Sequence, residues 1–154
     1  MDVIKKNPAL VEGEVSKAVD KIIEIGKQLD RDFHKIIESG KLEKIGENCW
    51  RSKAGLFYEE GSIHGNRIKH ILVHTYPDLN RPMHSIFNAT EDVVIKLVDE
   101  AWLMRNTGQS IIEKNGYEIF NIPMKRIIGN NGEKNIRIVV KAGTPKIISS
   151  YPIK

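Results

Sequence analysis

The sequence predicts a single α+β domain, with helices in its first part and an antiparallel β-meander at its C-terminal end. The chain has 154 residues, of which 40% are hydrophobic and 29% charged, which is typical of one globular domain with its own core. Before residue 104, apolar residues recur mostly at helical spacing. Beyond residue 110, β-branched segments alternate with turn-forming residues, as in a sheet of consecutive strands.

The first predicted helix covers residues 9–38. Its apolar residues lie at helical spacing with Lys, Asp and Glu between them: Val15, Ala18, Val19, Ile22 and Ile23. Gly26 could break this helix, and Gly40 is expected to end it. Residues 41–62 are predicted to be irregular, with a short strand at 55–58.

A second, shorter helix is predicted over residues 65–75. Its apolar stripe is Ile68, Ile71 and Leu72. The other face carries Arg67, His70 and His74, at spacings i, i+3 and i+7. The stretch "YPDLNRP" that follows must be a loop because two prolines and an Asp/Asn pair cannot continue a helix. "HSIFN", residues 84–88, is then predicted as a short strand-like segment.

The third predicted helix begins after Asn88, a candidate N-cap with Glu91 three residues later. The helical stripe that should face the core is Val94, Ile95, Val98, Ala101 and Trp102.

The C-terminal third predicts three or four antiparallel strands. The segments "GYEIFNI", "KRIIG", "NIRIVVK" and "KIISSYPI" are rich in β-branched residues, and the turn signals "GNNGE" and "AGTP" separate them. Side chains alternate along a strand, so Ser149 and Tyr151 should share one face while Ile148 and Ser150 take the other. A hydroxyl and a phenol on one face suit phosphate positioning and base stacking, although such residues often serve only packing.

The charge is unevenly distributed. Residues 106–154 contain eight Lys/Arg and three acidic residues, whereas the first 105 residues are close to neutral. A basic half suggests an anionic partner, most commonly nucleic acid, although lysines on solvated strand faces would give the same balance. No apolar run approaches the roughly 20 residues of a membrane helix, and no signal-peptide core is present. The single cysteine, Cys49, excludes an internal disulfide framework.

Four of the five histidines lie within residues 64–88, which raises three interpretations. His70 and His74 have the i, i+4 spacing of metal ligands, but no third ligand stands at a suitable spacing and Ile71 replaces the Glu of zinc proteases. Surface histidines without chemistry are the second interpretation, especially for His34 and His64. The third is general acid–base catalysis by two imidazoles from separate elements. RNA cleavage through the ribose 2′-OH needs such a pair together with a cation. It does not require a metal ion.

Three segments of the chain resemble one protein family. "RIKHILVH…RPMHSIF", the helix "EDVVIKLVDEAW" and the close "NIRIVVKAGTPKIISSYP" are similar to bacterial EndoU-type ribonucleases. These belong to the fold group that includes barnase, two colicins and RelE (BECR-like ribonucleases). The resemblance covers about residues 54–154. Residues 1–53 are outside the resemblance and are expected to form a helical N-terminal segment that serves in entry or docking or is part of the core.

The resemblance implies specific roles for residues of this chain. The family's first catalytic histidine precedes an aliphatic pair, which matches His70 rather than His74. The family's second catalytic histidine matches His84 in "MHSIF". By analogy, His84 is the base on the 2′-OH and His70 the acid for the 5′-oxygen. The family's closing hydroxyl-x-Tyr-Pro corresponds to Ser149 and Tyr151, which would position the scissile phosphate and the adjacent base.

The chain departs from the family in the catalytic lysine, which no unmistakable motif provides. Lys125 and Arg126 in "PMKRIIG" are the first candidates for the substrate-binding cation, and they should point to opposite faces of a strand. Lys114 and Lys141 remain alternatives.

The resemblance further implies a metal- and cofactor-independent endoribonuclease toxin of the kind used in contact-dependent inhibition between bacteria. A secreted or cell-surface protein would deliver it to the target-cell cytoplasm, where it would cut RNA, with tRNA as a candidate. A cognate immunity protein would neutralise it, and the free toxin would be a monomer. Two rivals remain, a nucleic-acid-binding module without catalysis and a histidine-based metal enzyme.

Overall fold

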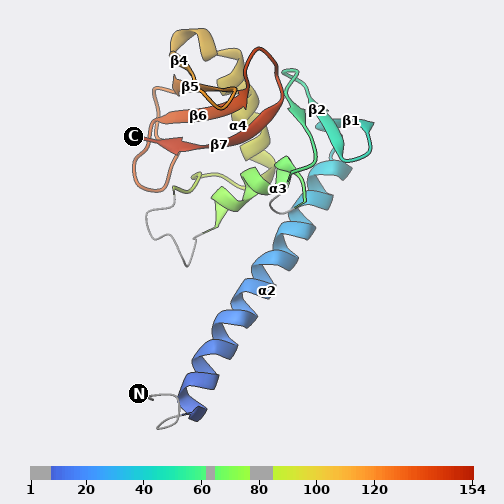
Figure 1. Cartoon of the computed structure of the whole chain (residues 1–154), viewed down its shortest axis with the longest axis vertical. Coiled ribbons are helices and arrows are strands. Elements are labelled where there is room, and N and C mark those ends of the chain that lie inside the picture. Colours follow the sequence, from blue (N-terminus) through green and yellow to red (C-terminus); the bar gives the residue numbers. More distant parts are fainter. Residues whose placement is uncertain (1–7, 62–64, 77–84) are drawn as a thin grey trace.

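The computed structural model describes residues 8–61, 65–76 and 85–154, without the side chains of residues 8–19, 21 and 22. It is a mixed α+β fold with helices and two antiparallel sheets (Figure 1). This agrees with the predicted α+β class. One hydrophobic core runs through it, from the C-terminal half of the first helix to the last strand.

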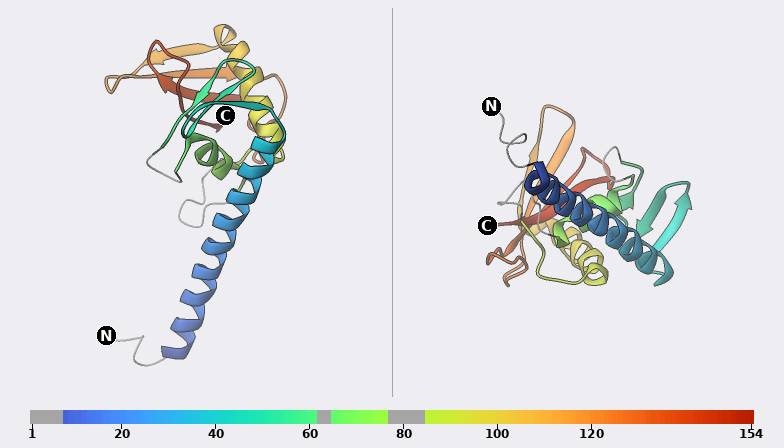
Figure 2. Two further views of the ribbon diagram at one scale, coloured as in Figure 1. Left: turned by 90° about the vertical axis from the view of Figure 1, so that its right-hand side faces the viewer. Right: turned by 90° about the horizontal axis from the view of Figure 1, so that it is seen from below.

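Helix α2 (Pro8–Glu38) extends away from the rest of the molecule as a single rod (Figures 1 and 2). The predicted break at Gly26 is wrong, because the helix continues through this residue. Gly40, at φ +73°, follows its end as predicted, since glycine enters the left-handed region without steric cost. The C-terminal turns of α2 contribute Leu29 and Ile36 to the core.

A three-stranded antiparallel sheet follows, made of β1 (Leu42–Gly46), β2 (Cys49–Ser52) and β3 (Phe57–Tyr58). The prediction of an irregular stretch missed β1 and β2, whereas the short strand at 55–58 corresponds to β3. The tight β1–β2 turn contains Asn48 at φ +49°, a conformation that asparagine tolerates. The predicted boundary between residues 53 and 54 lies between β2 and β3, which pair with each other through Trp50 and Tyr58.

Helix α3 (Arg67–Leu72) continues into the 3-10 turn η1 (Val73–Thr75), within the predicted range of 65–75. The side chain of Asn66 caps α3 by accepting a hydrogen bond from the Lys69 backbone N–H at 2.9 Å. The predicted apolar stripe is fully buried. After the loop, Phe87 forms only an isolated bridge with Gly129 where a strand-like segment was predicted.

Helix α4 (Glu91–Leu103) buries all five predicted core residues. Its N-cap is Thr90 rather than the predicted Asn88. The Thr90 hydroxyl donates to the Asp92 carboxylate at 2.7 Å, and this hydrogen bond lowers the pKa of Asp92. The short turn η2 (Arg105–Thr107) then leads to the second sheet.

The second sheet is an antiparallel meander in the order β4-β5-β6-β7. Its strands are β4 (Gln109–Ile112), β5 (Tyr117–Pro123), β6 (Asn135–Lys141) and β7 (Ile147–Ile153). The predicted meander is therefore present, but "KRIIG" is not one of its strands. Pro123 closes β5, and Lys125 takes φ +62°, which is incompatible with an extended strand. The fourth strand is instead β4, which lies on the other side of β5.

The two faces of this sheet differ. One packs against α4 and is apolar, as in the edge-to-face contact of Trp102 with Phe120 at 5.4 Å between ring centroids. The other face is not covered by α4 and carries partly exposed residues (Figure 2). Helix α3 lies along β7, at one border of this open face.

Candidate functional site

Four side chains form a line across the open face of the second sheet. The register pairs Gln109 of β4 with Asn121 of β5. It also pairs Asn121 with Arg137 of β6, and Arg137 with Tyr151 of β7. Because cross-strand partners point to the same side of a sheet, all four belong to one face. We call these four residues the open-face row.

Arg137 lies at the centre of the open-face row with neutral partners. Its Nε donates a hydrogen bond to Asn121 Oδ1 at 2.9 Å, and its Cζ lies 5.9 Å from the centroid of the Tyr151 ring. None of the ion pairs among the described residues includes Arg137. The amide and the ring therefore orient the guanidinium without cancelling its charge, which leaves it suited to an anion.

His74 extends the open-face row beyond β7. Its ring stacks on that of Tyr151, with 5.2 Å between centroids and 21° between planes. Its Nδ1 lies 2.9 Å from the carbonyl oxygen of Ser85. A carbonyl oxygen only accepts hydrogen bonds, so Nδ1 carries the hydrogen in this contact. In the neutral ring Nε2 is then the nitrogen that can accept a proton.

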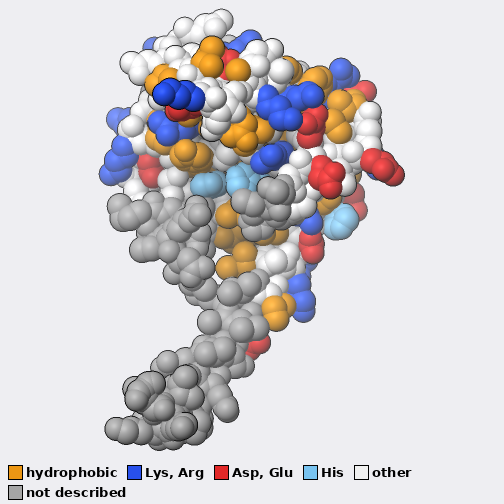
Figure 3. Space-filling model, viewed as in Figure 1, with side chains coloured by type: hydrophobic (Ala, Val, Ile, Leu, Met, Phe, Trp, Pro, Cys, Tyr) orange, Lys and Arg blue, Asp and Glu red, His pale blue; other side chains and the backbone are white. Residues whose placement is uncertain are grey.

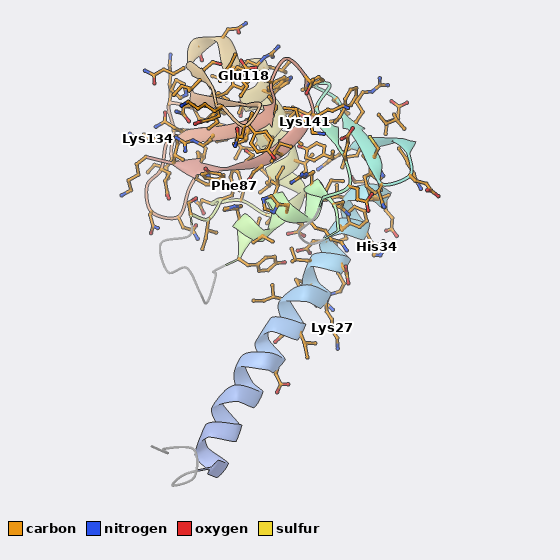
Figure 4. The ribbon with its side chains drawn as sticks, viewed as in Figure 1. Lys27, His34, Phe87, Glu118, Lys134 and Lys141 are labelled. Carbon is orange, nitrogen blue, oxygen red and sulfur yellow. The ribbon has the colours of Figure 1, made fainter. Side chains whose placement is uncertain are left out.

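Helix α3 presents its histidine-bearing side to β7. Arg67 Nη1 donates to the carbonyl oxygen of Ile148 at 3.5 Å, and His74 contacts Tyr151. His70 lies between them at a spacing that places it on the same side of the helix, and its Nδ1 atom is buried. Figure 3 shows histidine atoms grouped where α3 meets the sheet, away from His34 on α2, which Figure 4 labels.

The chain returns to this place after the loop. Phe87 N–H donates to the His74 carbonyl oxygen at 2.7 Å, and Ser85 contacts the His74 ring. His84, the second predicted catalytic histidine, precedes Ser85 in the sequence and lies outside the described residues, as does His64.

Of the other predicted site residues, Ser149 lies on the same face as Tyr151, two residues earlier in β7 and opposite Val139. Ser150 between them is buried on the other face. A β-bulge at Ile148 precedes this pair, since Ile147 and Ser149 pair with consecutive residues of β6. The structure therefore brings Ser149, Tyr151 and His74 to one region, and His70 lies on the side of α3 that faces β7.

The structure does not bring Lys125 or Arg126 to that region. Both follow the end of β5 in a loop, and Lys125 is exposed. Arg126 Nη2 pairs with Glu100 Oε2 at 2.5 Å, and Glu100 belongs to the helix that covers the opposite face. Of the two alternatives, Lys114 lies in the β4–β5 turn, and Lys141 lies at the far end of β6, where Figure 4 labels it.

Arg137 and Asn121 were missed by the sequence analysis, and His74 was set aside. Arg137 is the one charged residue within the apolar run "IRIVV", which is a local signal that such an arginine faces away from the core. Its neighbours come from other strands, however, and their identity depends on the register of the sheet.

Helix α2 anchors α3 and the residue that follows η1 through two contacts. The Tyr76 hydroxyl donates to the buried carboxylate of Asp32, and Lys69 Nζ pairs with Asp30 Oδ1 at 2.5 Å. The Lys69 ammonium lowers the pKa of Asp30. Burial, together with Asp32, raises the pKa of Tyr76, so the phenol stays protonated and remains a donor.

A separate pocket of about 170 Å³ lies between α4 and the first sheet, lined by Lys41, Lys53, Lys96 and Asp99 among others. Asp99 Oδ2 accepts a hydrogen bond from the Ala54 N–H at 3.2 Å. Among the described residues, Oδ1 has no hydrogen-bond partner, and burial raises the pKa of this carboxyl. This pocket shares no residue with the open-face row.

Comparisons of the chain with models of protein families, with curated proteins and with solved structures found no match. The described residues contain no group of three or more His, Cys, Asp or Glu side chains placed to hold a metal ion. No helix in the described part of the chain combines the length and apolar composition that a membrane-spanning segment needs.

Proposed function

We propose that this protein is a metal-independent RNA endonuclease that leaves a 2′,3′-cyclic phosphate. The observation that carries the proposal is the guanidinium of Arg137, which forms no ion pair among the described residues and is held between Asn121 and the Tyr151 ring on which His74 stacks. A fixed cation, an aromatic ring and imidazoles on one solvent-facing surface are what binding and cleavage of single-stranded RNA require.

The proposed reaction has two proton transfers. His84 takes the proton of the ribose 2′-OH, and the 2′-oxygen forms a bond to the adjacent phosphorus. The bond from phosphorus to the 5′-oxygen breaks, and His70 protonates the departing oxygen. Arg137, rather than Lys125 or Arg126, offsets the charge that builds up on the phosphoryl oxygens. Ser149 donates to the phosphate, and Tyr151 stacks on the neighbouring base.

His74 acts in this scheme as a positioning residue. Its stack fixes the plane of the Tyr151 ring, and its hydrogen bond to Ser85 ties the segment after His84 to the same place. We expect His74→Ala to raise KM more than it lowers kcat, because it loosens the base-stacking ring.

The decisive experiment incubates the purified chain with total RNA in EDTA and analyses the product ends. The proposal expects cleavage with 2′,3′-cyclic phosphate ends. It also expects His70→Ala and His84→Ala each to lose about 100-fold or more in rate. His34→Ala, an exposed histidine on α2, is the matched control and should cleave like the parent. Cleavage at the parental rate by either site variant would refute the assignment, and loss of activity in EDTA would favour the metal enzyme.

The second candidate is a nucleic-acid-binding module without catalysis. The observation that favours it is the placement of Arg137 beside the Tyr151 ring, because a cation and a stacking ring can bind RNA without an imidazole. It expects that RNA binding survives the double replacement of His70 and His84 by Ala and that the parent never cuts RNA.

We also propose the biological setting that the resemblance implies, a toxin domain acting on RNA, including tRNA, in the cytoplasm of a target bacterium. An immunity protein would cover the open face with acidic residues opposite Arg137, which would make association fast. Induced expression in a bacterium tests this setting. The parent should arrest growth and His70→Ala should not, whereas equal growth would contradict it.

A further inference from the structure

We propose that a pocket at one end of the open-face row is a subsite for a nucleobase flanking the cleaved linkage. This inference rests on the proposed RNA-cleaving function and identifies the part of the substrate that would set sequence preference.

The pocket has a volume of about 410 Å³ and lies where η2, β4, β5, β6 and β7 meet. Two members of the open-face row, Gln109 and Asn121, line it. The next cross-strand row, Pro123, Asn135 and Ile153, lines it too. The pocket is thus a continuation of the open face rather than a separate cavity.

The lining offers polar and apolar groups that suit a base, and Lys154 adds a cation that suits an adjoining phosphate. Gln109, Asn121 and Asn135 bring three carboxamides, each of which offers both a donor and an acceptor to the edge of a base. Pro123 and Ile153 supply apolar surface for the face of a base. Among the described residues, no Asp or Glu side chain, which would repel RNA, lines the pocket.

The position of the pocket relative to Arg137 fits one nucleotide step. Asn135 precedes Arg137 by two residues, and Ile153 follows Tyr151 by two, which places this row about 6.6 Å along the strands. Successive nucleotides of an extended single strand are separated by a similar distance. A phosphate on Arg137 would therefore place a flanking base at the pocket.

Asn121 connects the two sites. Its Oδ1 accepts the hydrogen bond from Arg137 Nε, while the residue also forms part of the pocket wall. The amide Nδ2 keeps two hydrogens with which it can donate to a base. Among the described residues, Asn135 makes no side-chain hydrogen bond to Arg137, so it is the better position at which to alter base preference without disturbing the cation.

The test uses DNA oligonucleotides that contain a single ribonucleotide, so that only one linkage can be cleaved. All four bases are placed in turn at the positions 5′ and 3′ of this linkage, and kcat/KM is measured for the parent and for Asn135→Ala. Asn130→Ala, an exposed amide in the β5–β6 connection outside the pocket, is the matched control. Binding of each oligonucleotide is measured in parallel by fluorescence anisotropy.

We expect the parent to prefer one or two bases at one of the two flanking positions by about tenfold or more. Asn135→Ala should reduce that preference to near twofold at that position only, while Asn130→Ala retains it. An equal loss of rate for all bases in Asn135→Ala, or an unchanged preference, would overturn the subsite. If the parent binds with a base preference that depends on Asn135 but never cleaves, the subsite stands and the endonuclease proposal fails. If it binds no oligonucleotide, both fail.

Discussion

The hydrogen bond between Tyr76 and Asp32 should make a measurable contribution to stability, and Tyr76→Phe removes it. Asp32 is 1% exposed, and its carboxylate has two side-chain partners, the Tyr76 hydroxyl and Gln28 Nε2 at 2.7 Å. The substitution leaves this buried carboxylate with Gln28 alone. A hydrogen bond to a charged group contributes about 1.5–3 kcal/mol. Since Tyr76 is only partly buried, water can replace part of the loss, and we expect about 1.5–2 kcal/mol.

Urea unfolding followed by circular dichroism measures this free energy, and a thermal scan should show Tm lower by about 4–6 °C for a chain of this size. Tyr117→Phe is the matched control, because the Tyr117 hydroxyl makes no side-chain hydrogen bond among the described residues. A double-mutant cycle with Asp32→Asn should give a coupling energy of about 1 kcal/mol or more. A loss below about 0.5 kcal/mol, or one equal to that of Tyr117→Phe, would show that the contact does not join α2 to the end of η1 as described.

Three further predictions concern other parts of the fold. Arg137→Gln keeps a donor beside Asn121 but removes the charge. We therefore expect kcat/KM for RNA to fall about 100-fold or more, with an almost unchanged Tm. A variant with the kcat/KM of the parent would show that Arg137 does not act in the reaction. Gly108→Ala would place a methyl group 2.9 Å from the carbonyl carbon of Asn121 and closer still to its oxygen, so urea unfolding should show a loss of about 1–3 kcal/mol, and a neutral result would mean that β4 shifts freely. Burial raises the pKa of Asp99 above 3.8, so its stabilising contribution is present below that pH and is lost as pH rises through the folded-state value. Asp99→Asn should therefore raise Tm at pH 7, and the Tm values of the variant and the parent should become equal below pH 3.8. A difference in Tm that stays constant with pH would show that the ionisation of Asp99 is not its cause.

The parts of the fold that the sequence predicted are those in which burial imposes a local period. Helix α4 buries one side only, so the spacing of Val94, Val98 and Ala101 directly reports which side faces the core. The same applies to β6, where Ile136 and Ile138 alternate with exposed or partly exposed residues. In both elements, the residues that the sequence pattern assigns to the core are the ones that are buried.

The first sheet was missed because its burial does not follow a simple period. Only Leu42 is buried in β1, whose other four residues are exposed, so the strand carries no alternation. Its formation depends on pairing with β2 across the turn at Asn48, which a local pattern does not show. Strand β4 was missed for the same reason, since all four of its residues are exposed.

The candidate site could be predicted only in part. Ser149 and Tyr151 share a face because alternation holds along β7 after the bulge at Ile148, and this much follows from the sequence. The partnership of Arg137 with Tyr151 depends on the register between β6 and β7, which is set by packing and by the bulge at Ile148. Lys125 seemed suited to a strand because "KRIIG" is rich in β-branched residues, but its positive φ places it in a loop.

Two arginines of this chain show why Arg137 is the stronger functional candidate. Arg126 lies near Glu100, and the ion pair neutralises its charge on the surface of α4. Arg137 is held instead by an amide oxygen and an aromatic ring, neither of which carries a compensating charge. A guanidinium that is oriented but not neutralised needs little reorganisation when an anion arrives, which is the condition for strong electrostatic stabilisation of a transition state. For this reason, we expect a phosphate to bind at the open face rather than in the loop that contains Arg126.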